Sequence, residues 1–407
     1  MSYRARGRSL RRILVLCAAL SGLGLLLTAC GGGSATSGTS SSGTSSSGTS
    51  SAGTVASSLA GFQQALQADY TGHFTAPPTS APLHKSGVNL WIISCGQASQ
   101  GCAEPVSNAK EAAQALGWKA TVFDGNFGIG DAYNTGIRQA IADHAQAIIA
   151  IGVDCSQAKA GYQAAKAAGI IVVGANSFDC NDPQVNDGPS LFTATVKYTP
   201  QFPTAAATQY EMGVAKADWI IVHTNGHAQV IDTNFAGLTG GKYVNQGFVA
   251  EMAKCTTCKI VKTISFSPQD TSDGTLKTEF ASALAQYPQA NAAINLSDGI
   301  IIQDGFAQAI QSAGRTKTLA LVGTEGFAPN VTLIRNQDGQ AAATPFDSNW
   351  VAWGAVDTVI RMLDHQPAVF EGAGVQVIDS THSLPAAGLS YSAPVNYVAL
   401  YKKAWGV

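Results

Sequence analysis

Two kinds of hydrophobic pattern alternate along residues 86–407. Short, almost continuous apolar runs rich in Val and Ile predict strands that helices cover on both faces. Between them, longer runs carry apolar residues every three or four positions and predict helices. The predicted strands are 88–94, 119–123, 147–153, 170–175, 192–197, 229–233, 260–266, 292–296 and 319–323. The predicted helices are 103–116, 131–144, 156–168, 204–221, 241–254, 274–286, 300–313 and 328–336.

The order of these segments predicts the fold class. Strands that alternate with helices form parallel sheets through right-handed crossovers. The long helical segment 204–221 interrupts the series, after which the alternation restarts. At about 320 residues, the predicted folded region exceeds the size at which a single core usually splits. The sequence therefore predicts an α/β protein with two doubly wound parallel-sheet lobes in series.

The first thirty residues carry the pattern of an export signal. Five arginines lie within residues 4–12, an apolar run covers residues 13–27, and small residues precede Cys30. This is the pattern of a bacterial lipoprotein signal (1–29), whose removal leaves a lipidated Cys30 as the first residue. An uncleaved anchor is the alternative, although the run is shorter than the roughly 20 residues of a membrane span. A weak twin-arginine pattern at residues 9–12 leaves the export route open.

The segment 30–85 is predicted to join the lipid anchor to the folded region. Residues 31–54 are almost entirely Gly, Ser and Thr, so they predict a flexible tether without a core. Residues 57–68 predict a short linker helix with Leu59, Phe62 and Leu66 near one face. A cluster of prolines ends this helix before the folded region, which is predicted to start near Ser86.

Composition excludes some classes of partner. Five of the 24 basic residues lie in the predicted signal, so the remaining chain has an excess of acidic residues over basic ones. This balance argues against a nucleic-acid partner. Beyond the signal, no apolar run reaches the length of a membrane span. The membrane is therefore expected to be reached only through the lipid anchor.

Cysteine usage points to an oxidising compartment. Without Cys17 of the signal and the lipidated Cys30, six of the eight cysteines remain. Six cysteines permit about 15 pairings. We favour the pairs that bracket one loop or one strand–helix–strand step. These are Cys95 with Cys102, Cys155 with Cys180, and Cys255 with Cys258. A redox centre or half a zinc site is the alternative for the last pair, but a catalytic pair normally opens a helix after a strand, whereas this one precedes a predicted strand.

Several short motifs extend across the predicted lobes. They are residues 111–118 (EAAQALGW), 123–126 (FDGN), 165–173 (AKAAGIIVV), 246–248 (QGF), 321–326 (LVGTEG) and 339–343 (GQAAA). Their order and spacing resemble those of the type I periplasmic solute-binding proteins, the ribose- and galactose-binding group that feeds ABC importers. The resemblance covers residues 87–363. It implies two lobes joined by three hinge crossings, with a solute held between the lobes.

The resemblance also implies the domain boundaries. We expect the hinge crossings near Pro200, Asp347 and Glu371. The N-terminal lobe then comprises residues 86–200 and 347–371, and the C-terminal lobe comprises residues 201–346 and 372–407. A protein of this kind is expected to act as a monomer.

The topology predicts where a solute binds. Ligands of open α/β sheets bind beyond the carboxyl ends of the strands, and two facing lobes can close over a small molecule. The candidate residues in these loops are Gln97, Asn126, Asn176 and Phe178 in the first lobe, and Asn234, Lys242, Ser297, Asp298, Glu325 and Phe346 in the second. Amides and carboxylates suit vicinal hydroxyls, and a Phe ring suits the apolar face of a sugar. For the Asn and Asp residues of these loops, a role in a cap or turn is the alternative.

Departures from the family's sugar-binding motifs limit the choice of solute. Sugar binders of this family often carry Asp-Arg after the fourth strand, an Arg before Gly-Phe and an Asp in the Val-Gly loop. This chain has Asn176, Lys242 and Glu325 at those places. The arginines beyond the signal all lie within or at the ends of predicted helices: Arg138, Arg315, Arg335 and Arg361. A bidentate arginine clamp on an anion is therefore not expected, and we expect a neutral, hydroxyl-bearing solute.

The sequence carries no familiar catalytic motif. It has no G-x-S-x-G, H-E-x-x-H, P-loop or G-x-G-x-x-G pattern. His223 and His227 have the spacing of a metal pair, but the Asn-Gly between them predicts the end of a helix. Asp298 and Glu325 could form a glycosidase pair, yet nothing in the sequence places them face to face. We therefore expect no enzymatic activity, no cofactor and no bound metal.

Together these features predict a solute-binding lipoprotein on the extracytoplasmic face of a bacterial cell membrane. It would capture a sugar or similar polyol by lobe closure and deliver it to an ABC permease. The alternative is a sensor that presents the solute to a membrane receptor kinase. Neighbouring genes would distinguish the two, because transport needs a permease and an ATPase, whereas sensing needs a histidine kinase.

Overall fold

The computed structural model describes residues 50–407. The predicted signal, Cys30 and most of the predicted tether lie outside the described residues. Within the described part, no helix is both long enough and apolar enough to span a membrane.

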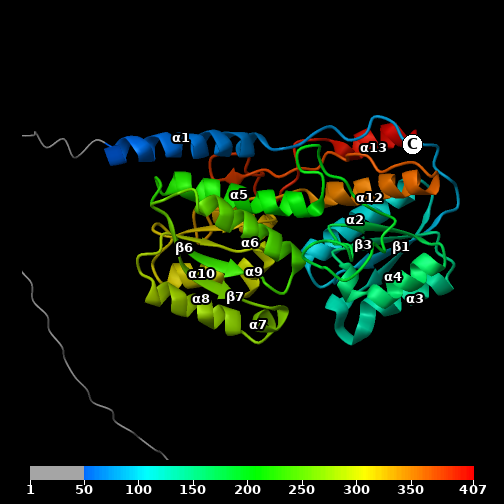
Figure 1. The fold of residues 1–407 in the computed structure, drawn as a ribbon, viewed down its shortest axis with the longest axis horizontal. Helices are drawn as coiled ribbons and strands as arrows, with labels where there is room; N and C mark the ends of the chain where they lie inside the picture. The colour runs from blue at the N-terminus through cyan, green and yellow to red at the C-terminus, as the bar shows by residue number, and fades with distance from the viewer. Residues whose placement is uncertain (1–49) are drawn as a thin grey trace, which may run out of the picture. The chain divides into compact units, whose positions relative to one another are not determined.

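The first sheet contains five parallel strands in the order β2-β1-β3-β4-β5. These strands are β1 (Asn89–Ser94), β2 (Lys119–Asp124), β3 (Ala147–Ile151), β4 (Ile171–Ala175) and β5 (Ala194–Thr195). Helices cover both faces (Figure 1). Two short 3₁₀ turns lie in the connecting loops. The helices are α2 (Gln100–Ala115), α3 (Ala132–Ala142), α4 (Lys159–Ala167), α12 (Ser348–Leu363) and α13 (Tyr397–Trp405), with the turns η1 (Asn126–Asp131) and η2 (Cys155–Gln157).

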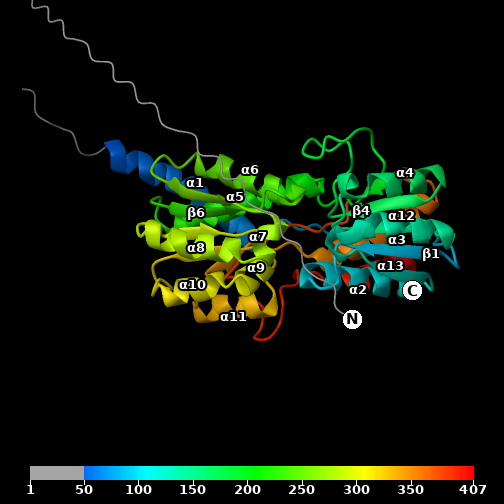
Figure 2. The same cartoon turned by 90° about the horizontal axis from the view of Figure 1, so that it is seen from below.

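The second sheet has six strands in the order β11-β10-β9-β8-β6-β7, parallel except for the antiparallel edge strand β11. They are β6 (Gln229–Asn234), β7 (Lys259–Ser265), β8 (Ala292–Ile294), β9 (Ala320–Gly323), β10 (Ala342–Ala343) and β11 (Ile378–Asp379). The helices of this lobe are α1 (Ser50–Thr71), α5 (Ala205–His223), α6 (Thr239–Met252), α7 (Pro268–Ser272), α8 (Thr275–Gln286), α9 (Asp298–Gln303), α10 (Phe306–Ser312) and α11 (Ala328–Asn336). Figure 2 shows the two lobes side by side, each with its own sheet. The predicted α/β class with two doubly wound lobes is confirmed.

Burial explains why the apolar runs became central strands. All five residues of β3 are buried, since helices pack on both faces of the sheet. The predicted helix 300–313 is instead two helices, α9 and α10. Gly305 lies between them with a φ of 66°, a left-handed conformation that ends one helix and that glycine adopts at little cost.

Helix α1 is longer than the predicted linker helix and packs along α5 in the second lobe (Figure 1). Phe62 and Leu66 are buried in the same apolar cluster as Trp219 of α5. The sequence predicts a folded region that begins near Ser86, but the structure includes α1 in the core of the second lobe. The short amphipathic pattern underestimates the helix, because Gly, Ser and Thr residues precede its apolar face.

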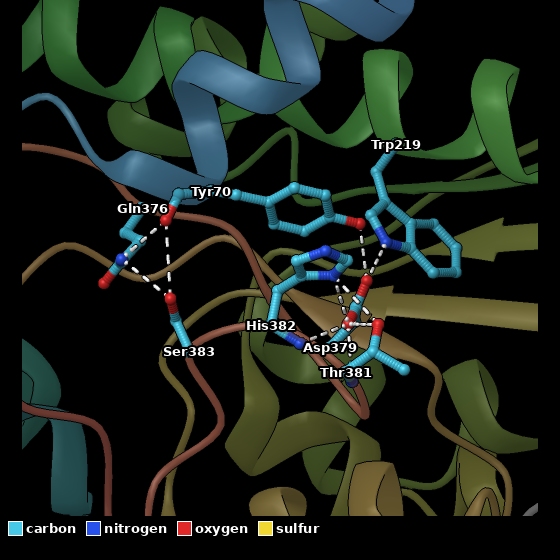
Figure 3. Close-up of polar contacts among 7 residues, drawn as sticks. All are labelled: Tyr70, Trp219, Gln376, Asp379, Thr381, His382 and Ser383. Atoms are coloured by element: carbon cyan, nitrogen blue, oxygen red, sulfur yellow. Dashed lines mark hydrogen bonds and ion pairs between the residues drawn. The ribbon is translucent and has the colours of Figure 1, made fainter.

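The C-terminal end of α1 is held by a polar network around Asp379 of β11 (Figure 3). Tyr70 Oη donates to Asp379 Oδ2 over 2.5 Å, and the indole N–H of Trp219 donates to the same oxygen over 3.0 Å. The Tyr70 ring stacks on His382 with centroids 3.7 Å apart. Gln376 Nε2 donates to the Tyr70 carbonyl over 2.8 Å. Side chains from α1, α5 and the β11 region thus fix α1 to the second lobe.

Residues 72–85, here called the strap, leave α1 and pass to the first lobe. The His73 N–H donates to the Val375 carbonyl over 2.9 Å, and the Thr75 N–H donates to the Gly372 carbonyl over 3.0 Å. At its far end, Lys85 accepts a hydrogen bond on its carbonyl from the indole of Trp118. The strap therefore adds a connection between the lobes beside the predicted crossing near Glu371.

Helix α13 belongs to the first lobe, although sequence analysis assigns residues 372–407 to the C-terminal lobe. Its Trp405 stacks on Trp353 of α12 with ring centroids 5.5 Å apart. The Trp405 indole also donates to Asp357 Oδ1 over 2.8 Å. Tyr401 is fully buried in the same apolar cluster. The aromatic residues of α13 pack against those of α12 in the first lobe. The chain therefore returns to the first lobe before Tyr397.

The described cysteines form three disulfides, and these are the pairs that sequence analysis favours: Cys95–Cys102, Cys155–Cys180 and Cys255–Cys258. The last bond closes the turn between α6 and β7. In this state the Cys255 and Cys258 thiols are not available as metal ligands.

Candidate functional site

A cavity of about 130 Å³ lies beyond the carboxyl ends of the strands, with walls from both lobes and from the segments that connect them. Its lining comprises Gly101, Glu104, Asn176, Gln209, Met212, Leu238, Leu296, Thr324, Glu325, Phe327, Phe346, Asp347, Ser348, Asn349, Ser390 and Tyr391. A second space of about 40 Å³ shares Gly101, Asn176 and Ser348 with it and extends toward β3 and β4. The described lining thus combines carboxylates, amides, hydroxyls and aromatic rings, and it includes no Lys, Arg or His.

Asn176 and Gln209 join the two lobes at one wall of this cavity. Asn176 follows β4 with a φ of 51°, a left-handed conformation that Asn tolerates better than most residues. Gln209 Nε2 of α5 donates to Asn176 Oδ1 over 2.6 Å. Gln209 is buried, and its Oε1 has no partner among the described residues. This oxygen packs against Gly240 at the start of α6.

Glu325, in the loop after β9, places a carboxylate at the cavity. Its Oε2 accepts the backbone N–H of Asp298 over 2.5 Å. Burial, together with the nearby charge of Asp298, raises the pKa of Glu325 to about 8. Lys216 lies behind this loop, where its ammonium donates to Thr324 Oγ1 over 2.9 Å and to the Gly323 carbonyl. Burial lowers the pKa of Lys216 to about 7, so it is a weak counter-charge for the two carboxylates.

Asp298 does not line the cavity, which corrects its predicted role as a ligand-binding residue. It is fully buried and accepts the backbone N–H of Thr324 over 2.9 Å and that of Gly326 over 2.5 Å. Gln340 Nε2 donates to its Oδ1 over 3.0 Å. Asp298 therefore shapes the loop that carries Glu325.

The hinge before α12 contributes a third wall. Asp347 caps α12 by accepting the N–H groups of Asn349 and Trp350 on one oxygen, each over 3.0 Å. Its other oxygen accepts the Ala393 N–H over 3.0 Å, so this carboxylate is already satisfied by the protein. Asn349 Oδ1, by contrast, is buried without a partner among the described residues. Phe346 supplies an aromatic ring to the lining.

Of the ten predicted ligand-binding residues, Asn176, Glu325 and Phe346 line the cavity. Three others lie outside the lining. Gln97 donates its side-chain N–H to Ser94 Oγ over 2.7 Å, Asn126 lies exposed in η1, and Ser297 is the N-cap of α9. Asn126 has a φ of 43°, which fits the turn role that is the alternative for the asparagines.

Phe178, Asn234 and Lys242 also lie outside the lining, and two of them belong to contacts between the lobes. The Phe178 ring of the first lobe stacks on Tyr243 of α6 with centroids 5.5 Å apart, and Tyr243 Oη donates to Asp182 Oδ1 over 2.7 Å. Lys242 lies close enough to Asp154 to favour its charged form, although burial dominates and raises the pKa of Asp154 to about 6. Asn234 ends β6, with a buried Oδ1 that has no described partner.

The sequence pattern does not predict several of the lining residues, because they do not follow a strand. Gln209 lies on α5, Glu104 lies on α2, and Ser390 and Tyr391 lie in the irregular segment before α13. The spacing of strands and helices gives no signal for residues brought to the cavity by a hinge. Asn349 could be predicted from the sequence, because it closely follows the predicted crossing at Asp347.

Potential metal ligands gather in two groups among the described residues: Cys155 with Asp179 and Cys180, and Asp69 with His73 and Glu211. The first group contains a disulfide, which removes its thiolates as ligands. Neither group includes His223 or His227, and His223 instead stacks on Trp219 with centroids 4.4 Å apart. None of these residues lines the cavity.

Comparison with known proteins identifies the family. The family model described as a periplasmic binding protein domain matches residues 92–367, which include strands of both sheets. The chain belongs to this family. Periplasmic binding proteins are non-enzymatic, extracytoplasmic solute-binding proteins. The predicted family and the prediction that the chain is not an enzyme are therefore confirmed.

Solved structures of periplasmic binding proteins share the fold. The binding component of the arabinose ABC transporter of Shewanella sp. ANA-3, with bound arabinofuranose, has 18% identity and a TM-score of 0.60, over 78% of this chain and 95% of that one. A 5-methylthioribose transporter protein of Thermotoga lettingae TMO has 18% identity and a TM-score of 0.60, over 81% and 100%. An ABC transporter protein of Mycobacterium smegmatis with bound glycerol has 19% identity and a TM-score of 0.59, over 75% and 100%. None of the curated proteins matches this sequence.

Proposed function

We propose that this periplasmic binding protein captures a small, neutral sugar or polyol between its lobes and delivers it to an ABC importer. The observation that carries the proposal is the cavity lining, where Glu325, Asn176 and Asn349 converge from the two lobes and the hinge. Carboxylates accept hydrogen bonds from hydroxyls, and amides both donate and accept them. Phe346 and Tyr391 add rings that suit the apolar face of a sugar. The sugar and glycerol ligands of the similar structures support this class of solute.

The charge of the lining favours a neutral solute over an anion. Glu104 and Glu325 lie in the described lining without a basic neighbour in it. A carboxylate or phosphate bound here would lose water and lie near acidic side chains without an Arg or Lys partner in the lining. A hydroxyl can instead exchange hydrogen bonds with either acidic side chain, whether the acid is ionised or protonated.

A thermal-shift screen of the purified protein against sugars, polyols, nucleosides and amino acids tests the proposal. A solute that binds only the folded state stabilises it by about 2.7 kcal/mol at a concentration one hundred times Kd. We expect stabilisation by at least one sugar or polyol. Stabilisation by amino acids or nucleosides alone would contradict the proposed solute class.

We further propose that Cys30 carries the lipid that holds the protein on the extracytoplasmic face of the membrane. Thioether lipidation needs the Cys30 thiol, so Cys30→Ser should move the protein from the membrane fraction to the medium or periplasm. Cys17→Ser, a change inside the predicted signal, is the matched control and should leave the protein in the membrane fraction. Unchanged fractionation of Cys30→Ser would refute the anchor.

A further inference from the structure

A cluster of possible metal ligands lies where α1, the strap and α5 meet. Asp69 lies in the last turn of α1, His73 lies at the start of the strap, and Glu211 lies in the second turn of α5. One ligand atom from each side chain lies within 4.8 Å of those of the other two. His73 Nε2 is 2.8 Å from Asp69 Oδ1 and 3.9 Å from Glu211 Oε1. Small movements of these side chains would bring all three atoms within ligand distance of one metal position.

The negative charge around this cluster is poorly compensated. Asp218 of α5 and Glu251 of α6 add two more carboxylates to the same region. The one nearby lysine, Lys254, is bonded to Glu251 over 2.6 Å, and its side chain is 64% exposed. His73 and Lys254 favour the charged form of Glu211, and Lys254 also favours that of Asp218. A buried excess of carboxylates needs either protons or a bound cation.

Two buried carboxylate oxygens in this region have no hydrogen-bond partner among the described residues. They are Oδ2 of Asp69, a residue that is 3% exposed, and Oδ1 of Asp218, which is 2% exposed. Asp218 lies about two turns after Glu211 on the same helix, α5. Unpaired buried oxygens are costly, so their presence points to a ligand that would satisfy them.

We propose that Asp69, His73 and Glu211 form a binding site for a divalent cation of the zinc type. One imidazole nitrogen and two carboxylate oxygens are ligands that Zn²⁺ accepts, whereas Ca²⁺ and Mg²⁺ prefer oxygen ligands only. A fourth position would be left for water. The His73 and Glu211 side chains are 13% and 15% exposed, so solvent reaches the cluster without unfolding.

The position of this site gives it a structural consequence. His73 is tied through its backbone N–H to Val375 of the hinge segment, and its ring meets Phe202 edge-on with centroids 5.3 Å apart. A cation bound to Asp69, His73 and Glu211 would join α1 and the strap to α5 at the hinge. The site shares no residue with the lining of the solute cavity, so it is a second and separate binding site.

Titration of the purified full-length protein with Zn²⁺, followed by calorimetry, tests the site directly. We expect one strong equivalent, together with a rise in thermal stability. His73→Ala and Glu211→Gln should each weaken binding by more than about tenfold, the lower end of what even the outer partners of metal ligands contribute. His227→Ala, which removes an exposed histidine, is the matched control and should bind Zn²⁺ like the unchanged protein.

Co²⁺ provides an independent readout, because its visible absorption reports the ligand set. A Co²⁺ spectrum that is present in the unchanged protein and in His227→Ala, but lost in His73→Ala, would support the site. Glu211→Gln is close in shape to the native residue, so it keeps the test valid if His73→Ala folds poorly. Absence of stoichiometric Zn²⁺ binding, or binding that both variants retain, would overturn the proposal. Neither outcome depends on which solute the cavity takes.

Discussion

At the scale of single residues, Asn176 is the predicted ligand-binding residue whose position can be tested most cleanly. It lines the cavity and accepts a hydrogen bond from Gln209. Asn176→Ala should weaken solute binding by about 1–3 kcal/mol, the cost of leaving a buried polar partner unsatisfied. Titration calorimetry with the solute found by screening measures the loss.

Asn126→Ala is the matched control for this change. Asn126 is also an asparagine beyond the carboxyl end of a strand, but it is exposed and lies outside the cavity lining. Equal affinity losses in the two variants would contradict the assigned cavity. An unchanged affinity in Asn176→Ala would remove Asn176 from the site.

Asp154 gives a prediction about pH. Its pKa, raised by burial to about 6, lies above the ordinary value of 3.8. The folded state therefore holds the Asp154 proton more tightly than the unfolded state, and this contribution to stability is present below pH 4 and is lost as the pH rises through 6. The Asn side chain, like the protonated Asp side chain, carries no charge, and it stays uncharged at both pH values. Relative to the unchanged protein, Asp154→Asn should therefore gain about 2–3 kcal/mol of unfolding free energy between pH 4 and pH 7.5.

Urea unfolding at the two pH values measures this gain, and the readout is the difference between them. Asp338→Asn replaces an exposed aspartate and should show no such difference. A gain of similar size in both variants, or none in Asp154→Asn, would contradict the assigned environment of Asp154.

The residue scale also shows where sequence reasoning ends. The strand pattern places Asn176, Asp298 and Glu325 in loops at the carboxyl ends of strands, and this part was predictable. The strand pattern does not show that the Asp298 carboxylate accepts hydrogen bonds from the backbone N–H groups of Thr324 and Gly326. Hydrogen bonds of this kind depend on how one loop folds against the next, which hydrophobic periodicity does not encode.

At the scale of elements, α1 is held by a specific hydrogen bond as well as by apolar burial. Although burial of Asp379 opposes the shift, hydrogen bonds from Tyr70 and Trp219 lower its pKa to about 2 (Figure 3). Tyr70→Phe removes one charge-assisted hydrogen bond and should cost about 1.5–3 kcal/mol. Hydrogen exchange in residues 59–71 should become faster.

Tyr210→Phe is a suitable control, because Tyr210 is 38% exposed on α5. Its exchange pattern in α1 should match that of the unchanged protein. If Tyr70→Phe leaves exchange in α1 as slow as before, the Asp379 network does not hold the helix.

The elements themselves were largely predictable, with exceptions that have physical causes. Helix α11 has the bounds that its apolar spacing predicts, Ala328–Asn336. Strand β11 and helix α13 were not predicted, since β11 contains only two residues and α13 follows a long irregular segment. The position of α13 in the first lobe depends on stacking between Trp405 and Trp353, a contact between residues far apart in sequence.

At the scale of the whole molecule, the lobes are joined by more of the chain than the predicted hinge. The strap and the segment before α13 add two connections to the crossings expected near Pro200, Asp347 and Glu371. Between the lobes, Gln209 bonds to Asn176, and Tyr243 bonds to Asp182. The lobes of this structure are therefore in contact, as expected for a closed binding protein.

Closure on a solute is the central claim, and small-angle scattering with and without the screened solute tests it most directly. The chain measured should begin at Ser50, because α1 is part of the second lobe's core. A solute that contacts both lobes stabilises the closed state relative to the open one. We predict a smaller radius of gyration on adding a stabilising sugar or polyol, and a much weaker response in Asn176→Ala at the same concentration. A radius of gyration that does not change while the solute demonstrably binds would contradict capture between the lobes.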